Sequence, residues 1–313
     1  AKLREIGIMP DVLICRTEVD LDEEHVKKIS LFCNVPKESV IVEKDVDVSI
    51  YEIPVILSDN GLDQLVLDHF KIDKPKCVLD DWKSLIGIIK NLDDNINIGM
   101  VGKYSELQDA YKSVDEALIH AGYSISKKIN ILKIPAEDIE SDPSVLNKVH
   151  GILIPGGFGS RGIEGKIAAV KYSRLNNIPF FGICLGLQCA VIEFSRNVCG
   201  LKNANTTEFI EDKHQKIDHP VICLMDEQAN VDLKGGTMRL GSYQCDIVEG
   251  TKVSKAYKQK IIFERHRHRY EVNNNYRELL EKNGMVLSGL NKELEVVEMI
   301  ELKNHPWFVG TQA

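Results

Sequence analysis

The 313-residue chain has no excess of basic residues. Lysine and arginine total 39 against 47 aspartates and glutamates, so the formal net charge is −8. A protein that binds nucleic acid along its surface needs a basic face to displace counterions, so this balance argues against nucleic-acid partners. It still allows a local anion site.

The chain also lacks a hydrophobic run suited to a membrane span. The longest uncharged stretch, residues 175–192, contains Pro179, two glycines and two asparagines, which is a poor composition for a spanning helix. No basic-then-apolar leader opens the sequence. We therefore expect no membrane partner.

A zinc-type metal site is not indicated either. None of the eight cysteines forms a C-x-x-C pair, and no short-spaced set of cysteine and histidine appears. Scattered cysteines in a chain of this length are typical of reduced thiols in a cytoplasmic protein. We expect no metal ligands in this chain.

The length and the alternation of elements predict two α/β domains. Residues 1–72 form a first, partial α/β domain, 73–95 a polar linker with a short helix around Trp82, and 96–313 a second domain. In the second domain, strands and helices alternate from 96 to 197, which predicts a doubly wound, mostly parallel sheet. Its tail is more β-rich, with strands expected at 219–224, 237–248, 260–272, 285–290, 294–300 and 307–310.

The sharpest chemical signal is Cys184, which lies between Gly182 and Gly186 where a predicted strand runs into a predicted helix. This is the nucleophile-elbow pattern with cysteine in place of serine. Glycines are needed there because the turn is too tight for side chains. A helix N-terminus would favour the thiolate, so we expect a lowered pKa for Cys184. The alternative is a buried core cysteine in a glycine-containing turn.

A second strand ends in Pro155-Gly-Gly-Phe-Gly. Backbone N–H groups of such a loop can point at a developing oxyanion, and Gly157 with Leu185 would make a suitable pair. The G-K-[ST] ending of a Walker loop is missing. A plain glycine-rich connection is the alternative.

Arginine and histidine alternate in the segment 264–271. On a strand, Arg265, Arg267 and Arg269 would share one face and His266 and His268 the other. Neighbouring guanidinium groups favour an anion partner such as a carboxylate or phosphate. A solvated charged strand is the alternative. The glycine-rich segment 235–241 is either a lid or a simple turn.

Together these motifs resemble the CTP synthase family. GICLGLQ fits any class I glutamine amidotransferase, whereas GGTMRLG, ERHRHRYEVN and NHPWFVG are much more specific to the family, and PGGFGSRG agrees with it. The resemblance continues upstream through DVLICR, LFCNVP and KDVDVSIYEIP, which are similar to the end of the family's nucleotide-binding synthetase domain.

The resemblance implies a ligase that aminates UTP to CTP. ATP with Mg²⁺ phosphorylates the 4-oxygen of UTP, and ammonia from glutamine displaces the phosphate. Glutamine is hydrolysed through a thioester, with GTP as allosteric activator, CTP as product inhibitor and a homotetramer as the assembly.

The resemblance also implies roles for individual residues. Cys184 would be the nucleophile, with an oxyanion hole formed by Gly157 and Leu185. Glutamine contacts would come from these two residues together with Gln188, Glu208 and Arg269. Nucleotide contacts upstream would come from Arg16, Lys28, Asp45 and Val46.

Two family features lie outside this sequence. The Gly-rich, lysine-containing phosphate loop would precede residue 1, and the catalytic histidine and glutamate would follow Gln312. We therefore expect a chain trimmed at both ends and deficient in activity. His305 imitates the missing motif but lies at the wrong end of its strand, and His266 and His268 are weak substitutes.

Two alternatives stay open. The chain could be a catalytically silent module that keeps the amidotransferase fold for binding or assembly. It could also be another class I glutaminase or a γ-glutamyl hydrolase, although the family-specific motifs argue against that.

Overall fold

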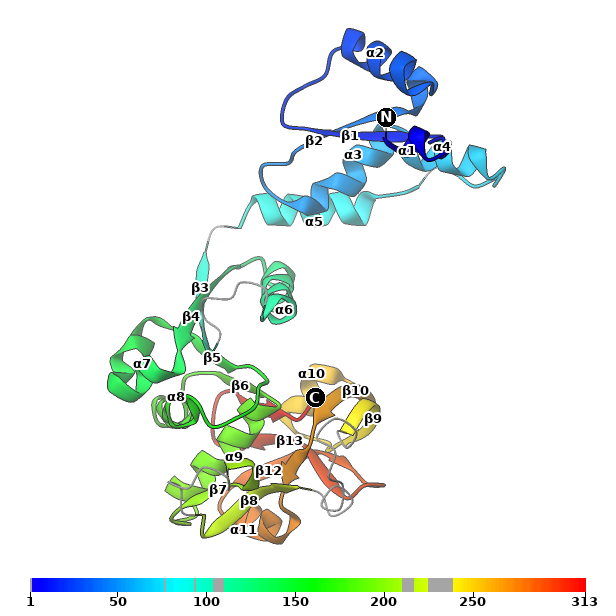
Figure 1. Ribbon diagram of the computed structural model, residues 1–313. Coiled ribbons are helices and arrows are strands. Elements are labelled where there is room, and N and C mark those ends of the chain that lie inside the picture. The colour runs from blue at the N-terminus through cyan, green and yellow to red at the C-terminus, as the bar shows by residue number, and fades with distance from the viewer. Residues whose placement is uncertain (1, 76, 93, 104–109, 210–216, 225–238) are drawn as a thin grey trace. The chain divides into compact units, whose positions relative to one another are not determined.

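The structure is a computed structural model that describes residues 2–75, 77–92, 94–103, 110–209, 217–224 and 239–313 (Figure 1). The chain divides into two compact units. One comprises Ala1–Asp94 with His120–Lys128, and the other comprises Asn95–Ile119 with Ile129–Ala313.

The first unit is built on two parallel strands, β1 and β2, in which Leu13 pairs with Val40. Helix α2 begins where the Asp22 side chain accepts the His25 N–H at 2.9 Å, and it ends at Asn34 in a left-handed conformation. The elements are α1 (Lys2–Glu5), β1 (Leu13–Thr17), α2 (Glu23–Cys33), η1 (Lys37–Ser39), β2 (Val40–Lys44), η2 (Ile50–Glu52), α3 (Ile53–Asp59), α4 (Leu62–His69) and α5 (Asp80–Lys90).

The predicted linker is partly helical. Helix α5 occupies most of its second half, and the Trp82 indole donates to the Tyr51 carbonyl at 2.5 Å. Lys90 pairs with Glu52 at 2.5 Å. Helix α5 is therefore packed within the first unit, and the boundary between domains stays a prediction.

The second unit holds a nine-stranded sheet in the order β10-β9-β12-β13-β14-β6-β5-β3-β4. The neighbours β14, β6, β5 and β3 run parallel, whereas the pairs from β10 to β14 run antiparallel. The strands are β3 (Asn95–Gly102), β4 (Lys128–Pro135), β5 (Gly151–Ile154), β6 (Phe180–Ile183), β9 (Arg239–Ile247), β10 (Ile261–His268), β12 (Met285–Asn291), β13 (Val296–Leu302) and β14 (Phe308–Thr311).

The α/β class is confirmed, but the sheet is mixed rather than mostly parallel. The parallel strands are joined through helices, as crossover connections require. In the tail, β12 and β13 are joined by a short turn, which forces an antiparallel pair. The predicted β-rich tail supplies this antiparallel half.

Helices cover the sheet, and a small second sheet adjoins it (Figure 1). The second sheet has the order β11-β8-β7. Its strands and the remaining elements are β7 (Ala204–Thr206), β8 (His219–Leu224), β11 (Tyr270–Val272), α6 (Lys112–Ser124), α7 (Ala136–Ser141), η3 (Pro143–Lys148), α8 (Ile163–Asn176), α9 (Leu185–Asn197), η4 (Thr207–Phe209), α10 (Lys252–Tyr257), η6 (Asn274–Tyr276) and α11 (Arg277–Lys282).

The predicted strand 260–272 is broken at Arg269, which lies between β10 and β11 in two different sheets. His266 and His268 lie on one face of β10 and Arg265 and Arg267 on the other, as predicted. The structure adds that the two histidines are buried and the two arginines are exposed. Arg269 does not continue that exposed row.

Among the residues that the structure describes, no helix is long and apolar enough to cross a membrane.

Candidate active site

Cys184 lies in a strained turn between β6 and α9. Its φ and ψ are 50° and −102°, an unusual backbone conformation for a residue with a side chain. A Cβ on Gly182 would lie 2.5 Å from the backbone carbon of Gly186, and a Cβ on Gly186 would overlap the carbonyl oxygen of Ile154. The predicted glycine frame is therefore a steric requirement of this elbow.

Two backbone amides converge on the thiol. The backbone N–H groups of Leu185 and Gly157 act on the Cys184 thiol and lower its pKa. The amide of Cys184 itself donates to the Thr311 carbonyl at 2.7 Å, which ties the elbow to β14. Amides that surround a nucleophile in this way are placed for a developing oxyanion.

The pKa of Cys184 is opposite to the sequence expectation. Burial raises the pKa of the thiol to about 11, and the negative charges of Glu271 and Glu208 raise it further. The amides of the helix N-terminus oppose this shift but do not overcome the loss of solvent. The thiol is protonated at neutral pH, so a nucleophilic role needs a base.

Glu208 and Arg269 reach the same site. The Glu208 carboxylate accepts the Gly159 N–H at 2.7 Å, and this amide belongs to the Pro155–Gly159 loop. Burial raises the pKa of Glu208, whereas the positive charges of Lys103, Lys166 and Arg269 lower it. The structure thus brings Cys184, Gly157, Leu185, Glu208 and Arg269 into one electrostatic neighbourhood.

Gln188 lies on α9 one turn after Cys184, and its side chain is buried. Its Nε2 donates to the Tyr270 carbonyl at 3.0 Å. Gln312 donates to the same carbonyl at 2.7 Å. The role of Gln188 toward glutamine stays a prediction, since its amide group is already engaged with the backbone.

The three histidines considered as bases have other partners or environments. His305 is buried, with Nε2 against the Ser173 carbonyl at 3.1 Å. Burial lowers the pKa of His266 to about 3. His268 contacts Glu271 at 2.6 Å. Within the described ranges, no hydrogen bond joins any of these rings to Cys184.

Sequence reasoning missed a buried ionic network beside the site. Arg239 pairs with Glu271 at 3.2 Å and with Glu298, and all three side chains are at least 96% buried. His268 contacts Glu271, and His266 lies 3.5 Å from Glu298. The available signal was Glu298, an acid that lies among Val296, Val297, Met299 and Ile300 in strand β13.

The predicted nucleotide residues lie in the first unit. Arg16 and Asp45 form an ion pair at 2.6 Å beside the carboxyl ends of β1 and β2, and Val46 follows directly. Lys28 is exposed on α2. The structure groups the first three, and nothing in it links Lys28 to them. Ligands bind at this end of parallel strands, so the placement suits a nucleotide base.

Two further features bear on the site. Most of the predicted lid, 235–241, lies outside the described residues, apart from its last three positions. In the part of the chain that the structure describes, no three histidine, cysteine, aspartate or glutamate side chains are grouped to hold a metal ion.

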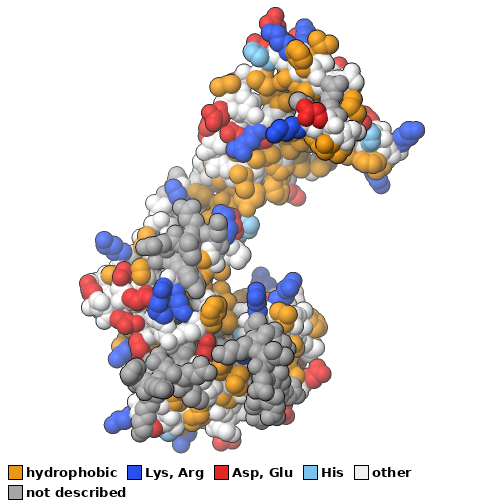
Figure 2. Space-filling model, in the orientation of Figure 1, with side chains coloured by type: hydrophobic (Ala, Val, Ile, Leu, Met, Phe, Trp, Pro, Cys, Tyr) orange, Lys and Arg blue, Asp and Glu red, His pale blue; other side chains and the backbone are white. Residues whose placement is uncertain are grey.

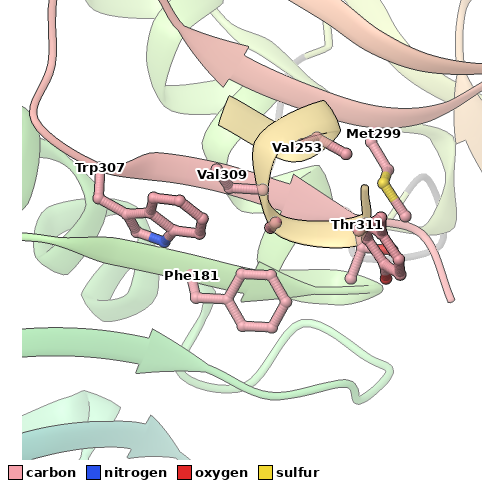
Figure 3. Close-up of a pocket in the computed structure, with 8 residues that line it drawn as sticks. Phe181, Val253, Met299, Trp307, Val309 and Thr311 are labelled. Atoms are coloured by element: carbon pink, nitrogen blue, oxygen red, sulfur yellow. The ribbon is translucent and has the colours of Figure 1, made fainter. Parts of the chain in front are cut away.

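An apolar pocket lies beside α10 (Figure 3). Its lining includes Phe181 on β6, Met299 on β13 and Trp307 just before β14. Thr311 also lines it, but Cys184 does not. The pocket is thus separate from the thiol and has few polar groups for catalysis.

Comparison with known proteins agrees with this geometry. The family model "Glutamine amidotransferase class-I" matches residues 106–313, and "CTP synthase N-terminus" matches 1–72. The chain is 50% identical over 99% of its length to the CTP synthase of Caldanaerobacter subterraneus and 51% identical over all of it to that of Fibrobacter succinogenes.

A solved structure is also similar. The glutaminase domain of Trypanosoma brucei CTPS, with bound acivicin, is 39% identical with a TM-score of 0.62, and the match covers 69% of this chain and 84% of that one. The chain belongs to the class I glutamine amidotransferase family. Within it, the chain falls among the CTP synthases. It spans 57% and 55% of the two curated relatives.

Proposed function

We propose that this chain provides the glutaminase end of a CTP synthase, with Cys184 as nucleophile. The observation that carries the proposal is the strained elbow, in which the Gly157 and Leu185 amides meet the Cys184 sulfur. The whole protein would be a cytoplasmic ligase that makes CTP from UTP and glutamine, with GTP as activator, CTP as inhibitor and a homotetramer as its assembly.

The chemistry at Cys184 follows from its surroundings. The sulfur attacks the carboxamide carbon of glutamine, and the two amides stabilise the oxyanion. The C–N bond then breaks to give a glutamyl thioester and ammonia, which takes up the thiol proton. Water hydrolyses the thioester to glutamate and frees the thiol. Glu208 would hold the substrate amino group and Arg269 its carboxylate.

The raised thiol pKa requires a base that removes this proton. We propose that in the whole protein a histidine, oriented by a glutamate, follows Gln312 just after the end of β14. The Thr311 carbonyl already bonds the Cys184 amide, so the residues after Gln312 start beside the elbow.

In the synthetase half, ATP with Mg²⁺ would supply the phosphoryl group that activates UTP. The first unit would contribute Arg16, Asp45 and Val46 near the nucleotide base, with Lys28 toward the pyrimidine nucleotide. Support comes from the position of the first three residues at the carboxyl ends of β1 and β2.

A second candidate is a module that binds glutamine without hydrolysing it. The pKa of about 11 at Cys184 favours this reading, because a protonated thiol is a poor nucleophile. The two candidates share the binding groups and differ in whether a covalent intermediate forms.

Labelling with a glutamine-like chloroketone separates the candidates. If the glutaminase proposal holds, the whole protein forms an adduct at Cys184 and releases ammonia from glutamine, and Cys184→Ala abolishes both. Cys189→Ala, on the same helix, serves as the control. For the 313-residue chain, the labelling rate should rise about tenfold per pH unit from pH 7 to 10, following the thiolate fraction.

Two outcomes count against the glutaminase. Glutamine binding without an adduct or ammonia would favour the silent module. Ammonia release that survives Cys184→Ala would remove Cys184 as nucleophile.

A further inference from the structure

The Tyr270 carbonyl is held by two buried side-chain amides. Gln188 Nε2 lies 3.0 Å from this oxygen and Gln312 Nε2 lies 2.7 Å from it, and the two residues are 3% and 0% exposed. We call this arrangement the Tyr270 clamp. Two donors on one carbonyl fix the direction of that peptide as well as its distance.

Both arms of the clamp start from the nucleophile elbow. Gln188 lies one helical turn after Cys184, and the backbone amide of Gln188 donates to the Cys184 carbonyl at 3.1 Å. Gln312 follows Thr311, whose carbonyl accepts the Cys184 amide. The two glutamines therefore fix the position of the Tyr270 carbonyl relative to the Cys184 elbow.

The residue after Tyr270 is fixed as well. The Glu271 carboxylate contacts His268 at 2.6 Å and Arg239 at 3.2 Å inside the buried network. The short connection between β10 and β11 is thus held at the Tyr270 carbonyl by the clamp and at Glu271 by ionic contacts.

Arg269 is the residue that forms this connection. Its side chain is partly exposed, and its positive charge acts on Glu208. The clamped carbonyl belongs to the Tyr270–Glu271 peptide, which shares the Tyr270 Cα with the planar peptide that joins Arg269 to Tyr270. Because Tyr270 is also paired with Leu224 in the β11–β8 ladder, holding this carbonyl limits where the Arg269 backbone can lie relative to Cys184. A small misplacement of such a group weakens binding strongly.

We propose that Gln312 is a positioning residue that acts through the Tyr270 carbonyl to place Arg269 against the α-carboxylate of the substrate. The proposal rests on the proposed function. It adds that Gln312 selects for amides that carry this carboxylate, although Gln312 does not touch it.

The test compares two ligands by calorimetry on the full chain. One is glutamine, and the other is 4-aminobutanamide, which is glutamine without its α-carboxylate. The variants are Gln312→Met, Arg269→Met and the double variant. Gln312→Asn, which keeps an amide but shortens its reach by one methylene, is a second variant in case Gln312→Met folds poorly.

A matched control is available in Asn291→Leu. Asn291 is also a buried amide, 4% exposed, and its Nδ2 donates to the Gln244 carbonyl at 2.9 Å on the antiparallel part of the sheet. Its loss removes this bond and the one that its Oδ1 accepts from the Leu294 N–H at 2.9 Å, without touching the clamp. It reports the effect of destabilisation alone.

We expect Gln312→Met and Gln312→Asn to raise the Kd for glutamine about tenfold or more, as loss of a well-placed charged contact does. The Kd for 4-aminobutanamide should stay within about twofold, since that ligand has no group for Arg269. The double variant should bind glutamine no more weakly than Arg269→Met. Asn291→Leu should leave both Kd values unchanged.

Contrary results have separate meanings. If Gln312→Met weakens both ligands equally, or adds its full effect to that of Arg269→Met, the positioning role is wrong and Gln312 is structural. If Arg269→Met itself leaves the Kd for glutamine unchanged, the proposed substrate contact fails, and the inference fails with it.

Discussion

The second unit buries apolar side chains on both faces of a nine-stranded sheet, whereas the first unit pairs two strands and leaves much of its apolar surface in contact with solvent (Figure 2). Among the described residues of the first unit, the buried hydrophobic side chains are Val35, Val40 and Ile41. Leu31, Phe32 and other apolar side chains there are about three-quarters exposed.

This contrast shows which part of the chain can stabilise itself. Folding free energy comes mainly from apolar surface removed from water, and small units bury too little of it. In the second unit, Phe180 and Phe308 stack with ring centroids 4.5 Å apart in the middle of the core. We expect the exposed apolar surface of the first unit to be covered in the whole protein.

The largest expected effect comes from separating the units. A protein of residues 95–313 should keep a cooperative thermal transition, because the large sheet and its helices remain together. A protein of residues 1–94, which is the first unit without its His120–Lys128 part, should show none, since its few buried side chains cannot offset the conformational entropy of about 1–2 kcal/mol per residue. Circular dichroism on heating measures both.

A cooperative transition in residues 1–94 would contradict the claim that only the second unit can stabilise itself. It would mean that the two-stranded unit closes a core of its own.

A smaller effect comes from adding one methyl group to a glycine of each unit. Gly186→Ala should destabilise the chain by about 3 kcal/mol or more, because the new Cβ overlaps the Ile154 carbonyl. Gly87→Ala, on exposed α5, meets nothing within 4 Å and should stabilise the first unit by about 0.5–1 kcal/mol. Urea unfolding gives both values.

Equal effects of the two substitutions would show that the elbow can relax around a side chain. The steric argument for the glycine frame would then be lost.

The predictions that the structure confirms came from sequence patterns over a few neighbouring residues. The run of apolar residues before Cys184 and the glycines around it predict a strand, a tight turn and a helix, and the structure has β6, the elbow and α9 there. The alternation in 264–271 predicts histidines on one face of a strand and arginines on the other, and β10 has His266 and His268 on its buried face and Arg265 and Arg267 on its exposed face. Side-chain period and backbone sterics decide these features within a few residues.

Features that depend on distant parts of the chain were not predicted. The break at Arg269 arises because β11 pairs with β8 in another sheet, where Tyr270 lies opposite Leu224. The pKa of Cys184 depends on burial by surrounding elements and on Glu208 and Glu271. The pairing of Arg239 with Glu298 joins strands 59 residues apart.

The smallest expected effect is a difference between the two units in how acid changes the free energy of unfolding. Burial lowers the pKa of His266 to about 3, with the charges of Arg239 and His268 acting in the same direction. The unfolded chain protonates this histidine near pH 6.5, but the folded chain stays neutral there. The stability contributed by the neutral ring is therefore present above pH 6.5 and is lost as the pH falls toward 3.

His266→Phe should remove this acid sensitivity. Between pH 6.5 and 4, the free energy of unfolding of the original chain should fall by up to about 1.4 kcal/mol per pH unit more than that of the variant. The same change at His69, exposed on α4 of the first unit, serves as the control. Urea unfolding across this pH range measures both slopes. Parallel curves for the original chain and His266→Phe would mean that the folded protein protonates His266 as readily as the unfolded chain does. The folded second unit would then accept a positive charge at His266 even though the side chain is buried.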